Sequence, residues 1–324
     1  MKHTLLGAVA AVALIGAAQA QAQTNVVVGH ALSPTSHYGV GAQAFIDTLT
    51  ELSGGRFTGD QAPASQLGGE RDMIEGLQIG SLDLVITSTG PLGNFVPEAL
   101  ALDLPFLFRD YDHARTTLDG EIGQELLALM RDADLVGLAW TENGFRHVTN
   151  SQRPIRTPED LGGLRLRTME NRVHMAAFEG MGAAPTPMAW PEVFGALQQG
   201  VVDGQENPIT VITAARFWEV QGHVTLTGHV YSPAIVLASP ILFDGLSEEE
   251  QGWFLEAARA SAAATRAEVD RLEREGVELM RANGMEVITE IDRGPFQELA
   301  AEASWSVYTD RFGTELLERI MAVE

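Results

Sequence analysis

The stretch Asn25-Val26-Val27-Val28-Gly29 opens the pattern that decides the fold. It is a short β-branched run, and an amphipathic helical stretch follows it at residues 38–52. A second helical stretch at residues 70–79 precedes another apolar run at 82–87. Alternation of this kind is typical of βαβ units on a largely parallel sheet. The sequence therefore predicts an α/β protein.

One strand in this region is weak. It should lie near residues 56–60, but Thr58-Gly59-Asp60-Gln61 has poor β propensity. Whether the segment 57–62 forms the edge of the sheet and contributes to a binding site is left open.

A second α/β segment follows in the later half of the chain. Strands are predicted at residues 164–168 and 201–204, and two more at 224–230 and 235–239 with Tyr231-Ser232-Pro233 between them. A chain of 324 residues usually divides into more than one domain. We therefore predict two lobes.

A long helix is predicted after the last of these strands. Ser247 and Glu250 form a capping-box pattern, and the helical stretch that they open continues to about Ala282 without a proline. At 1.5 Å per residue such a helix is on the order of 50 Å long, enough to lie across both lobes. Helices from Phe296 onward are predicted to close the second lobe. The predicted boundaries are 23–144 with 232–272 for lobe I, and 145–231 with 273–324 for lobe II.

Residues 1–22 are predicted to be a secretory signal peptide. A basic start precedes an apolar stretch at 5–18, and Ala18-Gln19-Ala20 fits the small-x-small cleavage rule. The exported chain would begin between Gln21 and Thr24. The alternative is a membrane anchor, which the apolar stretch disfavours because it is shorter than the ~20 residues that span a bilayer.

Composition excludes several functions. The net charge of −23 disfavours a nucleic-acid or anionic-membrane partner. The chain has no cysteine, and its one lysine, Lys2, lies in the predicted signal peptide. This excludes thiol nucleophiles and lysine chemistry in the exported protein. The eight histidines show no metal-ligand spacing, so neither a metal nor a cofactor is predicted.

Arg167 is the strongest candidate for ligand binding. In Leu164-Arg165-Leu166-Arg167-Thr168 the two arginines alternate with leucines, so they share one face of the predicted strand. Arg167 lies at the carboxyl end of this strand, where ligands bind in open α/β sheets, and its planar fork matches a carboxylate. The alternative is that Arg167 pairs with an acidic side chain of the protein itself.

Asn207 is the second candidate. It lies in the polar string Asp203-Gly204-Gln205-Glu206-Asn207-Pro208, which follows the apolar run. If its strand neighbours that of Arg167, both side chains could bind one carboxylate. Ordinary turn chemistry is the alternative for an asparagine before a proline.

Four motifs then occur in order along the chain. They are Gln66-Leu67-Gly68-Gly69-Glu70-Arg71, Leu164-Arg165-Leu166-Arg167, Pro187-Met188-Ala189-Trp190-Pro191-Glu192-Val193-Phe194 and Gly200-Val201-Val202-Asp203-Gly204-Gln205-Glu206-Asn207-Pro208. This ordered set resembles the DctP family of TRAP transporter solute-binding proteins. The resemblance implies the α/β two-lobe periplasmic binding protein fold, with a cleft between the lobes and a long helix spanning both.

The resemblance also implies a set of binding residues. Arg167 would grip the solute carboxylate, with Asn207 as a companion donor and Arg146 as a second cationic contact. The other implied contacts are Glu70, which would accept hydrogen bonds from solute hydroxyls, Trp190, which would pack over the ligand, and Tyr231, which would line the pocket near the hinge.

The implied partners are a small organic carboxylate and the small and large membrane subunits of an ion-driven transporter. The implied location of this protein is the periplasm. The solute could be a C4-dicarboxylate, a sugar acid or a related hydroxy acid. Two alternatives are a ligand-binding sensor without transport and an enzyme that acts on a small acid through Glu70 and a histidine. The sequence contains no spacing that demands such a catalytic pair, so the protein is predicted not to be an enzyme.

Overall fold

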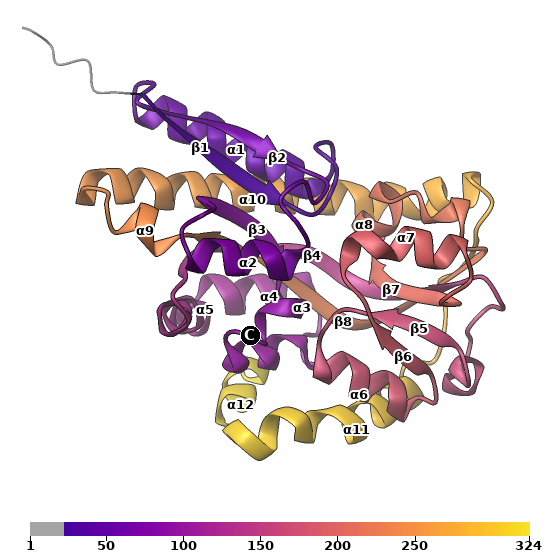
Figure 1. Ribbon diagram of the computed structural model, residues 1–324. Coiled ribbons are helices and arrows are strands. Elements are labelled where there is room, and N and C mark those ends of the chain that lie inside the picture. Colours follow the sequence, from indigo (N-terminus) through magenta and orange to yellow (C-terminus); the bar gives the residue numbers. More distant parts are fainter. Residues whose placement is uncertain (1–22) are drawn as a thin grey trace, which may run out of the picture.

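The computed structural model describes residues 23–324, so the predicted signal peptide lies outside the described residues. Within that range no helix combines the length and the apolar character needed to cross a bilayer. Two α/β lobes share one mixed sheet of nine strands (Figure 1). The strands are β1 (Thr24–His30), β2 (Phe57–Ala62), β3 (Leu84–Ser88), β4 (Val136–Asn150), β5 (Arg165–Thr168), β6 (Ala184–Pro187), β7 (Gly204–Pro208), β8 (His223–Ala238) and β9 (Glu286–Ile288).

Helices cover both faces of this sheet. They are α1 (His37–Leu52), α2 (Glu70–Gln78), α3 (Thr89–Leu92), α4 (Tyr111–Asp119), α5 (Glu121–Ala128), α6 (Arg172–Gly180), α7 (Trp190–Gln198), α8 (Ile209–Ala214), α9 (Pro240–Phe243), α10 (Glu248–Ala282), α11 (Gly294–Phe312) and α12 (Glu315–Met321). Segments of 3-10 helix are η1 (Pro97–Asp103), η2 (Leu129–Ala133), η3 (Pro158–Leu161) and η4 (Phe217–Glu219). The α/β fold predicted from the alternating pattern is confirmed.

The order of the strands is β2-β1-β3-β8-β4-β7-β5-β6, and β9 pairs with β8. β1, β2 and β3 run parallel in the first lobe, and β5, β6 and β7 run parallel in the second. β4 and β8 are antiparallel and pass through both lobes. Each lobe therefore presents the carboxyl ends of its parallel strands to the space between the lobes, which is the usual position of a ligand in such sheets.

The two strands predicted at 224–230 and 235–239 are in fact one strand, β8. It continues through Tyr231-Ser232-Pro233 because it pairs with β4 along its length. Pro233 lies opposite Glu142, beside a register shift between Glu142 and Gly144. A proline is tolerated in a sheet at such an irregularity, where it need not donate to the ladder. β4 and β8 thus form the link between the lobes.

The doubtful strand near 56–60 exists as β2. It is an edge strand that pairs only with β1, from Thr24 opposite Phe57 to Gly29 opposite Ala62. Its two end residues are buried, while Asp60 is exposed, so its poor propensity is offset by packing at the ends. Gly59 is required here because a Cβ would lie 2.9 Å from Ile46 of α1.

The long helix α10 begins and ends as predicted. Ser247 accepts a hydrogen bond from the Glu250 backbone, and Glu250 accepts one from the Ser247 backbone, which completes the capping box. α10 packs against α1 in the first lobe and against α8 in the second. Figure 1 shows it crossing behind both lobes.

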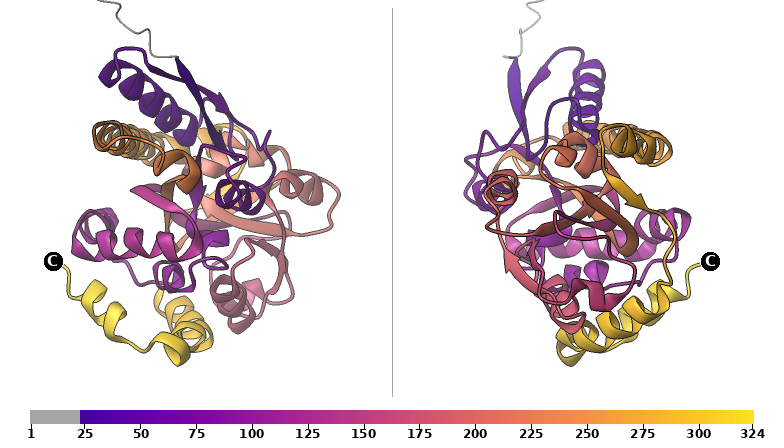
Figure 2. Two further views of the ribbon diagram at one scale, coloured as in Figure 1. Left: turned by 60° about the vertical axis from the view of Figure 1, so that its left-hand side comes forward. Right: turned by 90° about the vertical axis from the view of Figure 1, so that its right-hand side faces the viewer.

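The last two helices connect the lobes on the opposite side (Figure 2). α11 packs against α6 in the second lobe. α12, which the predicted boundaries assign to lobe II, instead buries Leu317 and Ile320 in the same apolar cluster as Leu118, Leu126 and Met130 of the first lobe. The chain thus crosses between the lobes once more at its end.

Candidate functional site

A cavity of about 330 Å³ lies between the two lobes. Five of the six predicted binding residues line it, namely Glu70, Arg146, Arg167, Trp190 and Asn207. They come from α2 in the first lobe, from β5, β7 and α7 in the second, and from the connecting strand β4. The fold therefore brings together residues that lie far apart in the sequence, such as Glu70 and Asn207.

Arg167 is a buried cation without a protein counter-ion. Its side chain is 3% exposed, and its Nε and Nη2 atoms donate to the Met188 carbonyl oxygen at 3.0 and 2.7 Å. Among residues 23–324 it forms no ion pair, and its Nη1 donates no hydrogen bond. Burial lowers the pKa of Arg167 to about 10, so it remains charged at neutral pH. A free guanidinium edge therefore faces the cavity.

The alternative for Arg167 was an ion pair with an acidic side chain of the protein itself. Arg165, on the same strand, forms such a pair. Arg165 lies half-exposed at the far end of β5 and pairs with Asp203 at 2.6 Å. The strand register places Arg167 opposite Gln205 of β7. The condition set for Asn207, that its strand neighbours that of Arg167, is thus met.

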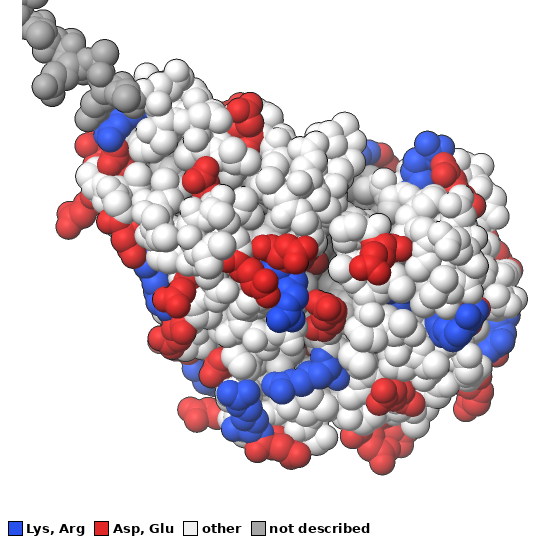
Figure 3. All heavy atoms as spheres, in the orientation of Figure 1, with Lys and Arg blue, Asp and Glu red and all other residues white. Residues whose placement is uncertain are grey.

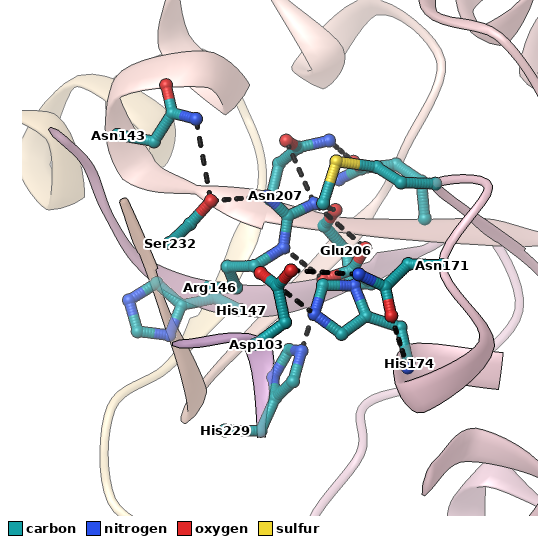
Figure 4. Close-up of polar contacts among 12 residues, drawn as sticks. Asp103, Asn143, Arg146, His147, Asn171, His174, Glu206, Asn207, His229 and Ser232 are labelled. Carbon is teal, nitrogen blue, oxygen red and sulfur yellow. Dashed lines mark hydrogen bonds and ion pairs between the residues drawn. The ribbon is translucent and has the colours of Figure 1, made fainter. Parts of the chain in front are cut away.

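Arg146 is buried like Arg167, but it is neutralised. Its Nε and Nη2 contact both carboxylate oxygens of Glu206, which is fully buried (Figure 4). Burial by itself would raise the pKa of Glu206, but Arg146 and a hydrogen bond with His229 outweigh it and hold this pKa well below its ordinary range. The pair therefore adds little net charge to the cavity.

Asn207 is oriented by this pair. Its Oδ1 accepts a hydrogen bond from Arg146 at 3.2 Å, which directs the Nδ2 group away from the arginine. One N–H of Nδ2 donates to Gln205. The second N–H is available to a ligand carboxylate beside Arg167.

Glu70 lies on the opposite wall, at the first position of α2. Its Oε1 accepts hydrogen bonds from the Ser88 backbone at 2.7 Å and from Thr87 Oγ1 at 3.1 Å. Its Oε2 accepts one from Ser88 Oγ at 2.9 Å. Three donors thus hold the carboxylate in place, and its remaining lone pairs can accept from ligand hydroxyls.

Trp190 and Tyr231 are placed differently. Trp190 begins α7 and lines the cavity from the second lobe. Tyr231 does not line it, because its ring is packed against Phe108, Tyr111 and Phe145 and its hydroxyl donates to Glu142 at 2.8 Å. The implied role of Tyr231 as a pocket residue is therefore not supported by its position.

Three polar residues of the cavity were not identified from the sequence: Tyr38, Ser88 and Asn143. Tyr38 is 1% exposed, and its hydroxyl, which lies beside the side chain of Asn143, forms no hydrogen bond of standard geometry within residues 23–324. It follows the carboxyl end of β1, so the rule that selected Arg167 could have found it. Asn143 lies on β4, and its Oδ1 lies 2.8 Å from His37 Nε2.

Three histidines far apart in the sequence lie near the Arg146–Glu206 pair (Figure 4): His147, His174 and His229. All three are buried, and burial lowers the pKa of each, to about 3 for His147 and His174. They are therefore neutral core side chains. Within residues 23–324 no three acidic or histidine side chains are grouped so as to hold a metal ion.

Two lobes that enclose a cavity with a free guanidinium on one wall and a fixed carboxylate on the other define a class, the two-lobed solute-binding proteins. The model of one family, described as bacterial extracellular solute-binding protein, family 7 (DctP), matches residues 28–310. The chain therefore belongs to the DctP family of extracellular solute-binding proteins.

Relatives agree with this assignment. A solute-binding protein of Verminephrobacter eiseniae is 47% identical over 307 residues, which cover 95% of this chain and 91% of that protein. A TRAP periplasmic solute-binding protein from Polaromonas sp. JS666, solved with D-erythronate, has a TM-score of 0.92 and 50% identity and covers 93% of this chain and 99% of its own. One from Bordetella bronchiseptica, with density assigned to pantoate, has a TM-score of 0.91 and 50% identity, over 93% of this chain and all of its own.

Proposed function

We propose that this protein captures a small organic carboxylate between its lobes in the periplasm and delivers it to the membrane subunits of a TRAP transporter. The observation that carries the proposal is Arg167, a buried cation that has no counter-ion among residues 23–324 and lies at the wall of an interlobe cavity. An unpaired buried charge is costly, and a ligand carboxylate would compensate it with charge-assisted hydrogen bonds. The ligands in the two similar structures, D-erythronate and density assigned to pantoate, are acids of this kind.

The rest of the cavity favours a small acid that carries hydroxyl groups. Polar side chains line both walls of the cavity, as in sites where a few placed polar groups fix the orientation of a small ligand. Asn207 supplies a donor beside Arg167, and Glu70 supplies acceptors on the opposite wall. An acid with hydroxyls near its carboxylate would satisfy both walls at once.

Binding would be coupled to closure of the lobes. Glu70 belongs to the first lobe, and Arg167 and Asn207 belong to the second, so only a closed form brings all three to one ligand. The ligand can favour this form because it makes the second set of contacts there alone. The connecting strands β4 and β8, with their register shifts, are the natural place for the bending.

Binding without chemical conversion is supported by the residues of the cavity wall. The titratable side chains that line it are Glu70, Arg146, Arg167 and Tyr38, and no histidine is among the lining residues. Incubation with the bound acid should return it unchanged, as nuclear magnetic resonance would show. Uptake of the acid by vesicles that contain the two membrane subunits would separate a transport protein from a sensor.

A thermal-shift screen of organic acids tests the proposal directly, with D-erythronate and pantoate as the first probes. A ligand present at 100 times its dissociation constant stabilises the folded protein by ~2.7 kcal/mol. This would raise the melting temperature by several degrees. Calorimetric titration should then give a stoichiometry of one acid per chain. If no hydroxy acid, sugar acid or dicarboxylate changes the melting temperature, the proposal is wrong.

A further inference from the structure

The charges that line the cavity can be counted. Within residues 23–324 they are Arg146, Arg167 and Glu70. Glu206 lies directly behind Arg146 and neutralises it. Arg167 has no such partner, and the carboxylate of Glu70 is held by neutral donors. The cavity therefore offers one free positive charge on one wall and one negative charge on the other.

A space that we call the acidic vestibule adjoins the cavity on the side of Glu70 and Arg167, both of which it shares. Its other charged residues are Asp72, Glu170, Glu192 and Arg71. Arg71 pairs with Glu75 at 3.1 Å and so has its own counter-ion. Figure 3, which views the molecule from the same side as Figure 1, shows acidic side chains gathered near the middle of the surface, with a basic side chain among them. The vestibule therefore holds an excess of negative charge.

A second space, which we call the apolar groove, adjoins the cavity at Ala31, Leu32 and Trp190. Its lining includes Phe194 and Phe217 and contains no charged side chain. A ligand that extends from Arg167 thus meets Glu70, the acidic vestibule or the apolar groove. Apart from Arg167 itself, neither the surroundings of Glu70 nor the acidic vestibule nor the apolar groove contains a cation that lacks a counter-ion among the described residues.

From this distribution we infer that the site selects acids with a single negative charge and rejects dicarboxylates of the same size. The inference rests on the proposed function and narrows its class of ligand. The first carboxylate of a ligand would be neutralised by Arg167. A second carboxylate would lie beside the partly buried carboxylate of Glu70 without a counter-ion, where desolvation and the repulsion of like charges both disfavour it. A hydroxyl at the same position would donate to Glu70 instead.

Tyr38 supports the same conclusion. Its buried hydroxyl lines the cavity and has no partner among the described residues. A neutral hydroxyl can donate to or accept from a ligand hydroxyl, but it supplies no charge to balance a carboxylate. Polar recognition away from Arg167 is thus achieved by Glu70, Tyr38 and Ser88, which suit the uncharged end of a hydroxy acid.

The test compares D-erythronate with meso-tartrate. The two acids share a four-carbon chain and the configuration of both inner hydroxyls, and they differ at one end, where erythronate has a hydroxymethyl group and tartrate a second carboxylate. We expect meso-tartrate to bind at least about 100-fold more weakly in calorimetric titrations, since each 1.4 kcal/mol is tenfold in affinity. The titrations are made at about 1 M salt, where the Debye length is ~3 Å, so that the overall charge of −23 contributes little.

The variant Glu70→Gln tests whether Glu70 causes the preference for D-erythronate over meso-tartrate. It removes the negative charge while it keeps the shape and one acceptor. Erythronate should bind more weakly, tartrate should lose less or gain, and the ratio of the two dissociation constants should fall at least about tenfold. Glu51→Gln is the matched control, because Glu51 is exposed on α1 and outside the cavity. It changes the net charge equally and should leave the ratio unchanged.

The outcomes separate the two proposals. If D-erythronate or another hydroxy acid binds and meso-tartrate binds as tightly, the charge selectivity is wrong while the proposed function stands. An unchanged ratio in Glu70→Gln would also overturn the selectivity. If no acid of any charge binds, the proposed function itself fails.

Discussion

Arg146 and Arg167 line the same cavity and are both almost fully buried, at 1% and 3% exposure, yet only one is neutralised within the protein. Arg146 shares two hydrogen bonds with the carboxylate of Glu206, which His229 also contacts. Among the described residues, the guanidinium of Arg167 donates hydrogen bonds to the Met188 carbonyl oxygen alone. A carbonyl group orients a guanidinium without cancelling its charge.

This difference separates a structural arginine from a binding arginine. The Arg146–Glu206 pair is a buried ion pair of the kind whose disruption is costly because the remaining charge has no partner. Arg167 already bears that cost in the absence of ligand, and in the proposed function this cost is the source of its affinity for an anion. Burial and residue type are the same in both cases, so the presence or absence of an acidic neighbour decides the role.

The largest expected effect is on stability, at the paired arginine. Arg146→Met leaves Glu206 buried without its cation and should lower the free energy of unfolding by about 3–5 kcal/mol. The double variant Arg146→Met, Glu206→Gln should recover most of this loss, because both charges are then removed. Urea unfolding followed by circular dichroism measures both variants. A single variant as stable as the parent would show that the pair is not the structural unit described here.

The next effect is on affinity, at the unpaired arginine. Arg167→Ala removes the free cation, and the dissociation constant of the bound acid should rise at least about 30-fold, since breaking a buried charge pair costs ~2–5 kcal/mol and each 1.4 kcal/mol is tenfold in affinity. The unliganded variant should be no less stable than the parent. Arg165→Ala is the control on the same strand, and its affinity should stay within about twofold. Equal losses in both variants would contradict the distinction.

Two buried carboxyl groups extend the comparison to acids. Asp103, unlike Glu206, has no arginine partner and accepts hydrogen bonds from Thr89 and Asn171, and burial raises its pKa to about 7. Its folded-state pKa lies above its unfolded value, so its contribution to stability is full at low pH and is lost as the pH rises through 7. Between pH 5 and pH 8 the parent should lose about 2–3 kcal/mol more stability than Asp103→Asn.

Urea unfolding at the two pH values measures this difference. The comparison between parent and variant cancels the contribution of buried histidines that do not contact Asp103, such as His147, whereas His174 lies 3.7 Å from Asp103 and its contribution changes with the variant. Their lowered pKa values act in the opposite direction, so that their contribution grows as the pH rises. A variant with the same pH dependence as the parent would show that Asp103 is ionised throughout this range.

The smallest effects distinguish two buried tyrosines. Tyr231 donates to Glu142 outside the cavity, so Tyr231→Phe should cost about 1 kcal/mol of stability and leave affinity unchanged. Tyr38 has an unpaired hydroxyl inside the cavity, so Tyr38→Phe should weaken binding of a hydroxy acid about fivefold without loss of stability. Thermal melts measure the stability of both variants, and calorimetric titrations measure their affinity. Weaker binding by Tyr231→Phe but not by Tyr38→Phe would place Tyr231, rather than Tyr38, in the binding site.

Much of this protein was determined by local sequence. The alternation of strands and helices, the capping box at Ser247 and the proline-free stretch to Ala282 specify elements that form through neighbouring residues. Arg167 could be chosen from the sequence because it lies at the carboxyl end of a predicted strand. Strand direction and side-chain alternation are local properties. The same reasoning made Asn207 a candidate, and the ordered motifs indicated the family and through it Glu70, Arg146 and Trp190.

Other features were decided only by the tertiary structure. The polar string at 204–208 is not the turn after a strand but a buried strand itself, because Thr149 and Arg146 of β4 satisfy Gln205 and Glu206. The same neighbours determined that Arg146 is paired and Arg167 is free. Sequence spacing cannot show this, since the counter-ion of Arg146 lies 60 residues away and becomes its neighbour only when β4 and β7 pair. Which charge remains uncompensated is a property of the packed molecule.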